Sequence, residues 1–573
     1  MPTAADPSTP GNSRLVEEHV PFSSSILWHW MKQYYTEGGV AVWTGGDIPF
    51  HITNTPLLAT EWVRTIFTLL RDFHRQGLLD PSAPIEVYEL GPGTGRHAYF
   101  LLRELDKLEK QSRVLAPEGL KFVLELSELG VKGLQTLSEH PQLRPYLESG
   151  RLRLSQFDIA EDAAPKAWPS SAEKRQPSAN PVFVIANYVL DSLPYDVVRC
   201  RGRARSLAYS NVQVQGLAPD QDPRSLVDLG EKIELSFDFT EDTATFHNAG
   251  WDHVLSRYDD IEDTHLPFPT GAMTFMERLR NWSRVGAVLL AADKSFVSRE
   301  QLQGLEVPEL VPHGGGFSFN ANVHTMGYLA EGWGGRAWHT SARDGTLDLS
   351  HLVLPAVDRA FPDSFLEMEI RFEQLELFHA VDRFRLKESV DEAVPRPKFR
   401  LALDLLRLSG IDPQVFYEVS DHLLNGLDFE EVEQEAQTEL KSVLQRCLED
   451  VFPVGDEVDM AFEVGRIAYR LEDYALSERA FLMSISAFGE DPKTRFNLGL
   501  GWYYQKRWPE AEQAFERALE LDGDYIDAQE WLEKTRRSAK AEAEQDEIPS
   551  DGGARTAGNC LEIAHIEAND ERK

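Results

Sequence analysis

A glycine-rich loop is the segment of this sequence whose residue types and spacing are most suited to chemistry. Gly91, Gly93 and Gly95 lie between a short apolar run at 85–90 and an amphipathic pattern that begins near residue 94. Glycines are needed where a backbone turns sharply and approaches a ligand without side-chain clashes. A strand, a glycine loop and a helix in this order are typical of nucleotide-type cofactor sites, so the segment predicts a cofactor loop.

The spacing within this loop narrows the choice of cofactor. A dinucleotide fingerprint would have a third glycine at position 96, where this chain has Arg96. The G-x-G-x-G spacing that follows Glu89 is instead the pattern of S-adenosylmethionine (SAM) methyltransferases. We expect Glu89 to hold the cationic methionine end of that cofactor. One such loop is weak evidence by itself, and an unrelated nucleotide fold is the alternative.

Acidic side chains follow the next two apolar runs. KFVLELSEL (121–129) predicts the second strand of the sheet, and Glu125 is suited to accept hydrogen bonds from ribose hydroxyls. RLRLSQFDI (151–159) predicts the third strand, and Asp158 is suited to accept from an adenine amino group. The cofactor-binding residues expected from the sequence are therefore Glu89, Gly91, Gly93, Gly95, Glu125 and Asp158.

A further buried strand ends in polar residues that could face a second substrate. PVFVIANYVLDSLPYDVV (181–198) is apolar up to Asn187 and then brings Tyr188 and Asp191. Open α/β sheets place their chemistry at the carboxyl ends of central strands. We expect Asn187 and Asp191 to face the acceptor, with Asp191 as the better candidate for a base, and Tyr188 to stack on the acceptor or shield it.

Each of these residues also has a structural interpretation. Asn187 would suit a helix cap, and Asp191 would suit a solvated acid in a first helical turn. His97 follows the glycine loop and could reach the site, but a lone His at the start of a helix fits a structural role better. No group of residues has metal-ligand spacing, so we expect no metal. The three cysteines are too few and too dispersed for a disulfide framework.

The order of the predicted elements indicates four segments. Residues 1–18 and 541–573 are polar, and we expect both to be disordered. Strand-like and helix-like patterns alternate through 19–390, which predicts an α/β domain, with a β-rich insertion at about 200–265. Residues 391–540 have continuous helical periodicity. The fold class we expect is a Rossmann-like α/β methyltransferase sheet followed by an all-α segment.

The helical segment contains an internal repeat. Similar residues recur at one constant offset, which joins Gly465 to Gly499, Tyr474 to Trp508, Ala480 to Ala514 and Phe481 to Phe515. This offset equals the length of a tetratricopeptide repeat. The pattern predicts two repeats at about 458–525 and a capping helix at 525–540. An ordinary helical bundle is the alternative.

Charge and hydropathy restrict the expected partners. The chain has 573 residues with 58 Lys and Arg against 94 Asp and Glu, so its net charge is −36. This balance opposes binding to nucleic acids and to anionic membranes, and it favours a basic or neutral partner. No long uninterrupted apolar stretch and no secretory signal is present, so we expect a cytoplasmic protein without a membrane span.

Together these motifs resemble the MidA-like family of class I methyltransferases, which includes the mitochondrial complex I assembly arginine methyltransferase. The resemblance spans about 22–335. It lies in the E-L-G-P-G-x-G loop at 89–95, in Leu124-Glu125-Leu126-Ser127, and in Asn187 to Pro194, which is similar to an N-E-x-x-D-A-L-P signature. Weaker matches are GGDIPFHITNTPLLATEWV (45–63), through Asp47, Thr53 and Pro56, and Phe319 to Thr325. The resemblance implies a SAM-dependent methyltransferase.

The chain also departs from that family. Tyr188 occupies the place of the signature Glu, Asn322 occupies that of a later His, and the fused repeats are not part of the family core. We therefore carry over the fold, the cofactor and the reaction, but not the acceptor. The first hypothesis is methyl transfer to a protein or peptide recruited by the repeats.

Two alternatives remain open. One is a small-molecule methyltransferase that uses the helices to form a homodimer, and the aromatic residues Trp28, Trp30 and Trp43 are compatible with its apolar acceptor. The other is a catalytically silent assembly factor that keeps the fold without turnover.

Overall fold

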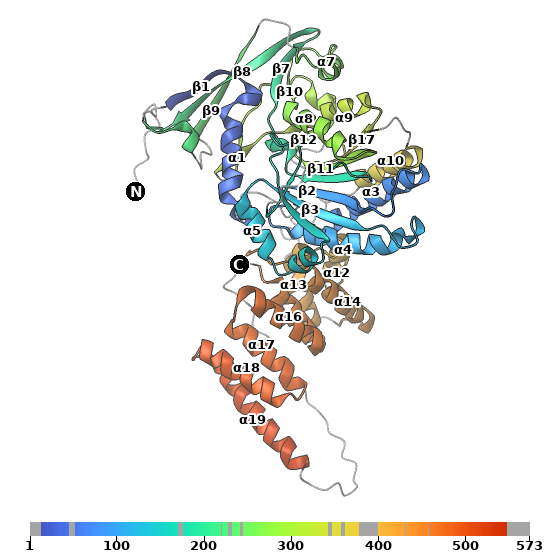
Figure 1. Ribbon diagram of the computed structural model, residues 1–573. Coiled ribbons are helices and arrows are strands. Elements are labelled where there is room, and N and C mark those ends of the chain that lie inside the picture. The colour runs from blue at the N-terminus through green and yellow to red at the C-terminus, as the bar shows by residue number, and fades with distance from the viewer. Residues whose placement is uncertain are drawn as a thin grey trace. The chain divides into compact units, whose positions relative to one another are not determined.

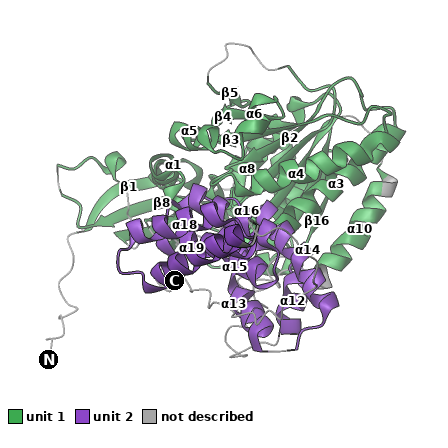
Figure 2. Cartoon of the chain, turned by 90° about the horizontal axis from the view of Figure 1, so that it is seen from below, with its two compact units in different colours: residues 1–382 green, residues 383–573 purple. Residues whose placement is uncertain are grey.

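The computed structural model divides the chain into two compact units, residues 1–382 and 383–573 (Figure 2). The structure describes residues 13–546 apart from 45–51, 170–175, 219, 227–231, 241–244, 314, 342–346, 357–360, 378–398, 430 and 456–457. The predicted domain boundary at 390 therefore lies outside the described residues, as does the Asp47 part of the family resemblance. Each described core cluster is made of residues from one unit only.

The first unit contains an eight-stranded sheet whose order is β16-β17-β11-β6-β2-β3-β4-β5. Its parallel strands, numbered by appearance along the chain, lie in the order 3-2-1-4-5, and the remaining pairs are antiparallel. The strands are β2 (Ile85–Leu90), β3 (Phe122–Glu128), β4 (Leu152–Gln156), β5 (Lys166–Ala167), β6 (Val182–Asn187), β11 (Gly286–Asp293), β16 (Arg336–His339) and β17 (Asp348–Pro355). The chain order reverses between β2 and β6, which is where open α/β sheets bind ligands.

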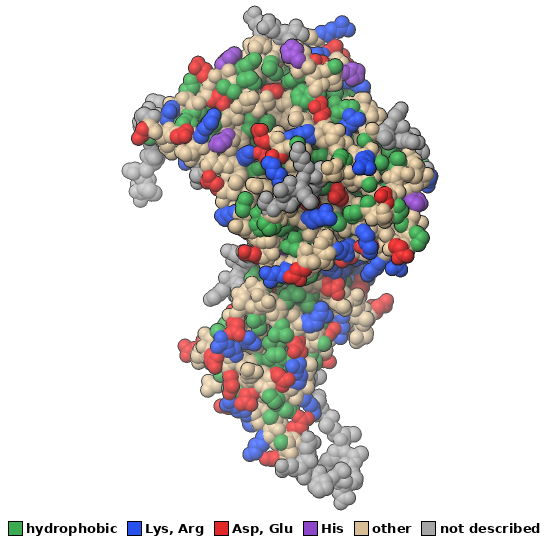
Figure 3. All heavy atoms as spheres, viewed as in Figure 1, with side chains coloured by type: hydrophobic (Ala, Val, Ile, Leu, Met, Phe, Trp, Pro, Cys, Tyr) green, Lys and Arg blue, Asp and Glu red, His purple; other side chains and the backbone are tan. Residues whose placement is uncertain are grey.

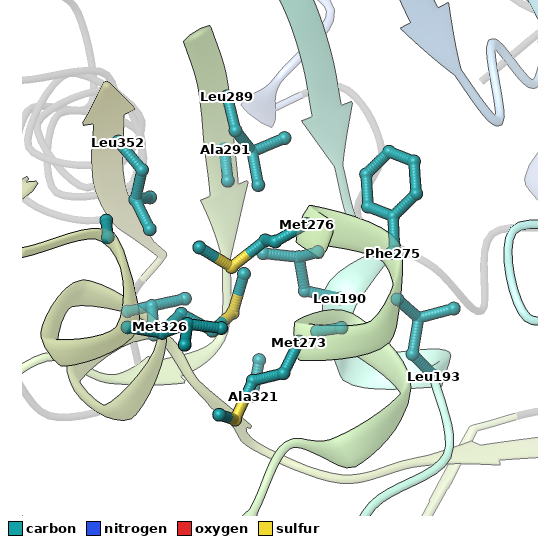
Figure 4. Packing of buried hydrophobic residues seen from close by; sticks show 14 of the residues in the cluster. Leu190, Leu193, Met273, Phe275, Met276, Leu289, Ala291, Ala321, Met326 and Leu352 are labelled. Atoms are coloured by element: carbon teal, nitrogen blue, oxygen red, sulfur yellow. The ribbon is translucent and has the colours of Figure 1, made fainter. Parts of the chain in front are cut away.

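Helices cover both faces of this sheet, as the fold class predicts (Figure 1). One face carries α3 (Pro56–Arg75) and α4 (Arg96–Gln111), and the other carries α8 (Thr270–Leu279) and α9 (Val323–Gly332). The strands are apolar because they are buried on both faces. In Figure 4, Met273 and Met276 of α8 pack with Leu289 and Ala291 of β11.

A second, five-stranded antiparallel sheet flanks the first. It consists of β1 (Ser13–Pro21), β7 (Asp196–Arg201), β8 (Ala204–Gln215), β9 (Ile233–Phe239) and β10 (Thr264–Phe268). Helix α1 (Ile26–Gly38) packs on it through an aromatic cluster that contains Phe22, Trp28 and Phe319. The expectation of a β-rich segment at about 200–265 agrees with β8 and β9, whereas β1 and most of β7 and β10 lie outside that range.

The prediction of disorder through residue 18 is wrong for residues 13–18, which belong to β1. Polar and apolar residues are mixed on both faces of this strand, so its sequence does not show the alternation of a half-buried strand. Its order comes from pairing with β8, a strand distant in the sequence, in which Arg14 pairs with Val214 and Val20 with Ser210. Residues 1–12 lie outside the described part of the chain.

The second unit is helical throughout its described residues. Its helices are α12 (Phe399–Leu408), α13 (Pro413–Phe429), α14 (Gln434–Asp450), α15 (Met460–Arg470), α16 (Tyr474–Phe488), α17 (Pro492–Tyr504), α18 (Trp508–Leu521) and α19 (Ile526–Asp546). The repeat period predicted from the sequence reappears in the packing. A Cβ at Gly465 would lie 2.5 Å from the Phe481 ring, and a Cβ at Gly499 would lie 2.7 Å from the Phe515 ring. Only glycine lets the helices of each pair approach this closely.

The capping helix is longer than the sequence predicts. Helix α19 continues to Asp546, so the prediction of disorder from residue 541 is wrong for residues 541–546. The acidic Glu542 in this part accepts hydrogen bonds from Lys506 and Trp508, which attaches the end of α19 to the preceding repeat. Residues 547–573 lie outside the described part.

The surface charge, the hydropathy of the helices and the state of the cysteines can be compared with what the composition predicts. Lys and Arg side chains are interspersed with Asp and Glu on the face that Figure 3 displays. Within the described ranges, no helix is both long enough and apolar enough to cross a membrane. The two cysteines that the structure describes, Cys200 and Cys447, are buried and not bonded to each other.

Candidate active site

A cavity of about 440 Å³ opens at the carboxyl edge of the sheet, where the chain order reverses. This volume is within the usual range for a small-molecule or cofactor site. The lining residues most relevant to chemistry come from four places. They are Trp28, Lys32 and Tyr35 of α1 with Trp43 of the short helix α2 (Ala41–Thr44); Gly91 and Gly93 of the glycine loop; Glu128 at the end of β3 and Asp158 just beyond β4; and Tyr188, Val189 and Ser192 to Pro194 after β6.

The glycine loop forms one wall of this cavity. Gly91, Gly93 and Gly95 all have positive φ, a backbone conformation that costs other residues about 1–2 kcal/mol. A Cβ at Gly93 would lie 3.1 Å from the Trp43 ring, and a Cβ at Gly91 would lie 3.3 Å from Val189. Gly91 and Gly93 line the cavity, as predicted, whereas Gly95 does not.

The acid at the end of the second parallel strand is Glu128. It is the last residue of β3, it lines the cavity, and it accepts backbone N–H groups from Leu129 and Gly130 through Oε1. Burial raises the pKa of this carboxyl group. Gly133 of α5 (Val131–Glu139) leaves room for it, because a Cβ there would lie 2.9 Å from the Glu128 Cγ.

Glu125, which the sequence predicts as the ribose ligand, is not brought to this cavity. It lies in the middle of β3, opposite Tyr88 of β2, and it lines a different cavity together with Arg153 and Trp168. The prediction misplaced the end of the strand by three positions. The signal that could have corrected it is Gly130, which directly precedes the helix that begins at Val131.

Asp158 lies where the sequence places it, beyond the end of β4 on the cavity wall. Its carboxylate accepts from Ala160 N and forms an ion pair with Lys32 of α1. Lys32 also lines the cavity, and its side chain is half-exposed. A ligand group that donates a hydrogen bond to Asp158 would therefore also lie close to the Lys32 ammonium group. The sequence did not indicate this neighbouring positive charge.

Glu89 and His97 form a buried pair beneath the glycine loop. The Nδ1 atom of His97 lies 2.9 Å from Oε1 of Glu89, and both side chains are almost fully buried. The second oxygen of Glu89 has no hydrogen-bond partner among the described residues. Neither side chain lines the cavity, so His97 has the structural role that its position favours, as a partner of Glu89.

The segment of residues 188–194, here called the acceptor loop, forms the wall opposite the glycine loop. Tyr188 lines the cavity, as predicted, with a φ of 54°. Asn187 and Asp191 are buried and do not line the cavity, so the prediction that they face it is not met. The Oγ of Ser192, which does line it, donates to Asp191 Oδ1 over 3.3 Å.

The environment of Asp191 changes its acidity. Burial raises the pKa of its carboxyl group to about 6, although Ser192 and Lys294 oppose the shift. Burial and the Asp191 charge together raise the pKa of Asp293, at the end of β11. Burial and then the Asp191 charge raise the pKa of Tyr35, which places the acid within electrostatic range of the cavity. A carboxylate that titrates near neutral pH is suited to general base catalysis.

The wall contributed by α1 was largely absent from the sequence-based prediction. Tyr35 stacks on Trp43 with a ring separation of 5.9 Å, and both line the cavity together with Trp28. Trp28 and Trp43 agree with the expectation of an aromatic acceptor side, but Trp30 points elsewhere and bonds Pro223 O. Nothing local to α1 indicates that it covers a cavity formed by strands that are distant in the sequence.

The residues present fit SAM. The fit rests on two observations: two glycines with positive φ line the cavity, and a buried acid at the end of the second parallel strand lines it as well. Glu128 would accept from the ribose hydroxyls, and Asp158 would accept from the adenine amino group. Glu89 does not line the cavity, so the prediction that it holds the methionine end is not met by this structure.

The sequence comparisons agree with this cofactor. Residues 65–304 match a family described as “Putative S-adenosyl-L-methionine-dependent methyltransferase”, and residues 492–525 match the tetratricopeptide repeat. The chain thus combines a SAM-dependent methyltransferase domain with a C-terminal tetratricopeptide repeat, and the resemblance, the α/β fold class and the cofactor predicted from the sequence are confirmed. No curated protein matches the chain.

Several solved structures are similar to this chain. A protein from Burkholderia thailandensis bound to S-adenosyl-homocysteine is 16% identical over 61% of this chain and 90% of that one, with a TM-score of 0.37. A native structure of an uncharacterized Burkholderia thailandensis protein is 17% identical over 60% and 90%, with a TM-score of 0.34. Phosphoethanolamine N-methyltransferase 1 from Haemonchus contortus is 8% identical over 67% and 60%, with a TM-score of 0.25.

Proposed function

We propose that the methyltransferase domain of this chain transfers a methyl group from SAM to a protein or peptide acceptor that the helical repeats help to recruit. The observation that carries the proposal is a single cavity with a cofactor wall and an acceptor wall. Gly91, Gly93 and Glu128 belong to the first wall, and Tyr188 and Ser192 belong to the second.

SAM supplies an electrophilic methyl group on a sulfonium, so the protein needs to do little covalent chemistry. What the chain must provide is position, exclusion of water and, where the acceptor requires it, removal of a proton. Tyr188 and the aromatic residues of α1 make the acceptor side apolar, which favours a dry site. Ser192 Oγ connects the cavity to Asp191 Oδ1, so a proton released by the acceptor can reach this carboxylate through the serine hydroxyl.

The second unit supports a macromolecular acceptor. The close pairs Gly465–Phe481 and Gly499–Phe515 are those of packed tetratricopeptide helices, and arrays of such repeats form surfaces that hold protein segments. The strong net negative charge favours a partner with basic residues.

Transfer of labelled methyl groups tests the proposal. Purified full-length protein is incubated with methyl-labelled SAM and a cell lysate, and the products are separated into protein and small-molecule fractions. We expect label in protein, and we expect deletion of residues 399–573 to remove it while affinity for S-adenosyl-homocysteine (SAH) is kept. Retained SAH affinity is the control for folding of the shortened chain.

Two other results would replace the proposal. Label in the small-molecule fraction that survives the deletion would indicate a small-molecule methyltransferase. SAH binding without any labelled product would indicate an assembly factor that keeps the cofactor site but has no turnover.

A further inference from the structure

We propose that Asp293 is a positioning residue for methyl transfer, because it holds the backbone of the acceptor loop in the conformation that brings Tyr188 and Ser192 to the cavity. The proposal rests on the proposed function, since the loop matters for turnover only if this cavity performs transfer. Asp293 itself does not line the cavity. Asp293 is the last residue of β11, a strand that lies about one hundred residues after the acceptor loop in the sequence.

The contacts of Asp293 are concentrated on the first half of the acceptor loop. One carboxylate oxygen, Oδ2, accepts three consecutive backbone N–H groups: Val189 at 3.1 Å, Leu190 at 2.7 Å and Asp191 at 3.2 Å. The other oxygen accepts from Lys294 N at 2.8 Å. Asp293 is 1% exposed, so water does not compete for these hydrogen bonds.

This arrangement makes the loop backbone depend on an acceptor at position 293. Three successive N–H groups that converge on one point form a nest, which is stable when an anionic or strongly polar group occupies it. Without that group, three buried donors would lose their partner. The loop would then turn these donors toward water, and the segment between Tyr188 and Ser192 would change its path.

Tyr188 is the residue that this change would affect first. Its φ of 54° lies in the left-handed region, which residues with a Cβ rarely adopt unless their surroundings require it. The Tyr188 N–H donates to Ala292 O, next to Asp293, and the three N–H groups held by Asp293 follow directly. Asp293 and its neighbour in β11 thus hold Tyr188 where its ring reaches the cavity.

The loop has further anchors in α8: the Gly271 N–H donates to Pro194 O at 2.8 Å, and two leucines of the loop pack in the core. Figure 4 shows Leu190 and Leu193 directed into the core beside Met273 and Phe275 of α8. These contacts fix how deeply the loop is buried but have no direction, because dispersion and burial are not directional. The hydrogen bonds of Asp293 supply the direction in the first half of the loop, so they orient the backbone next to Tyr188 and Ser192.

Hydrogen exchange at the three amides tests the proposal on the full-length protein. In Asp293→Ala, we expect the amides of Val189, Leu190 and Asp191 to exchange at least about tenfold faster, and labelled-methyl transfer to fall about a hundredfold. Asp293→Asn retains an oxygen that can accept the three N–H groups. We expect it to restore slow exchange and most of the transfer, a rescue that a role in overall stability would not produce. SAH affinity should stay within about threefold in both variants.

Asp72→Ala is the matched control, because Asp72 is also a buried acid that accepts a backbone N–H, from Ser364, but lies away from the cavity. We expect it to destabilise the unit without changing exchange at the acceptor loop. The positioning role is overturned if the three amides of Asp293→Ala exchange faster but the variant transfers methyl groups as fast as the wild type. It is also overturned if Asp293→Asn restores slow exchange without restoring transfer. Absence of transfer by the wild type would instead contradict the proposed function, whatever the exchange data show.

Discussion

Glu125 and Glu128 both belong to β3 but line two different cavities. Glu128 ends the strand and borders the cavity of the glycine loop, whereas Glu125 lies opposite Tyr88 in the middle of the strand. Because the two acids share a strand and a charge, each is a control for the other.

Replacing Glu128 should weaken cofactor binding. Glu128→Gln removes the charged acceptor for ribose hydroxyls, and hydrogen bonds to charged groups contribute about 1.5–3 kcal/mol, so SAH affinity should fall about tenfold or more. Calorimetric titration measures the change. Glu125→Gln should leave the affinity within about threefold. Equal losses in the two variants would show that Glu128 has no special part in the site.

A side chain at position 93 should abolish SAH binding. In Gly93→Val, the new Cβ would lie 3.1 Å from Trp43 at a φ of 53°, so the loop or the indole on the cavity wall must shift. Gly216→Val is the matched control, since Gly216 also has a positive φ but nothing within 4 Å of its Cβ position. It should cost about 1–2 kcal/mol of stability without loss of binding. If Gly93→Val still bound SAH, the cofactor site would not be at the glycine loop.

Methyl transfer should depend on the ionisation of Asp191. Its pKa is raised to about 6, so the base form is lost below that pH, and transfer should then fall about tenfold per pH unit. Asp191→Ala should lower transfer by about two to four orders of magnitude and keep SAH affinity. The pH profile of labelled-methyl transfer measures both effects. A parallel loss of SAH affinity would mean that Asp191 supports the cofactor site.

The same shift predicts a pH-dependent change in stability. The folded state keeps the Asp191 proton up to pH about 6, whereas the unfolded chain loses it near pH 4. The free energy of unfolding is therefore higher below pH 4 than above pH 6. Above pH 6 its burial as a carboxylate costs about 2–3 kcal/mol. Asp191→Asn should therefore unfold at a higher denaturant concentration than wild type at pH 8, and the difference should shrink below pH 4. A difference independent of pH would contradict the assigned shift.

The repeat packing predicts opposite effects at two glycines of α17. Gly499→Ala places a methyl group 2.7 Å from the Phe515 ring and should lower the melting temperature of the second unit. Gly501 lies two residues further along the same helix, and a Cβ there would have no neighbouring atom within 4 Å. Gly501→Ala should therefore stabilise the helix by up to about 1 kcal/mol. Thermal unfolding followed by circular dichroism distinguishes the two. Similar effects of both variants would argue against a close helix pair at Gly499.

The features predicted correctly from the sequence are those that local spacing determines. The glycine loop needs only three glycines after a strand, and the repeat needs only a constant period that recurs in the contacts of Gly465 and Gly499. Asp158 and Tyr188 were also placed on the cavity, because the ends of their strands are marked by polar residues.

The features missed depend on contacts between distant segments. Whether Glu125 or Glu128 ends β3 is decided by the register with β2 and by where α5 begins. Strand β1 is too polar to be recognised without its partner β8. Lys32 and Tyr35 reach the cavity only because α1 packs between the second sheet and the edge of the first, and no pattern within α1 indicates this.

A crystal structure of the full-length protein with SAH tests the central claim most directly. We expect the ribose hydroxyls to bond Glu128, the homocysteine part to lie along Gly91 and Gly93, and the sulfur to face Tyr188 across the cavity. SAH bound away from the glycine loop, or a cavity that stays empty when SAH is present in excess, would contradict it.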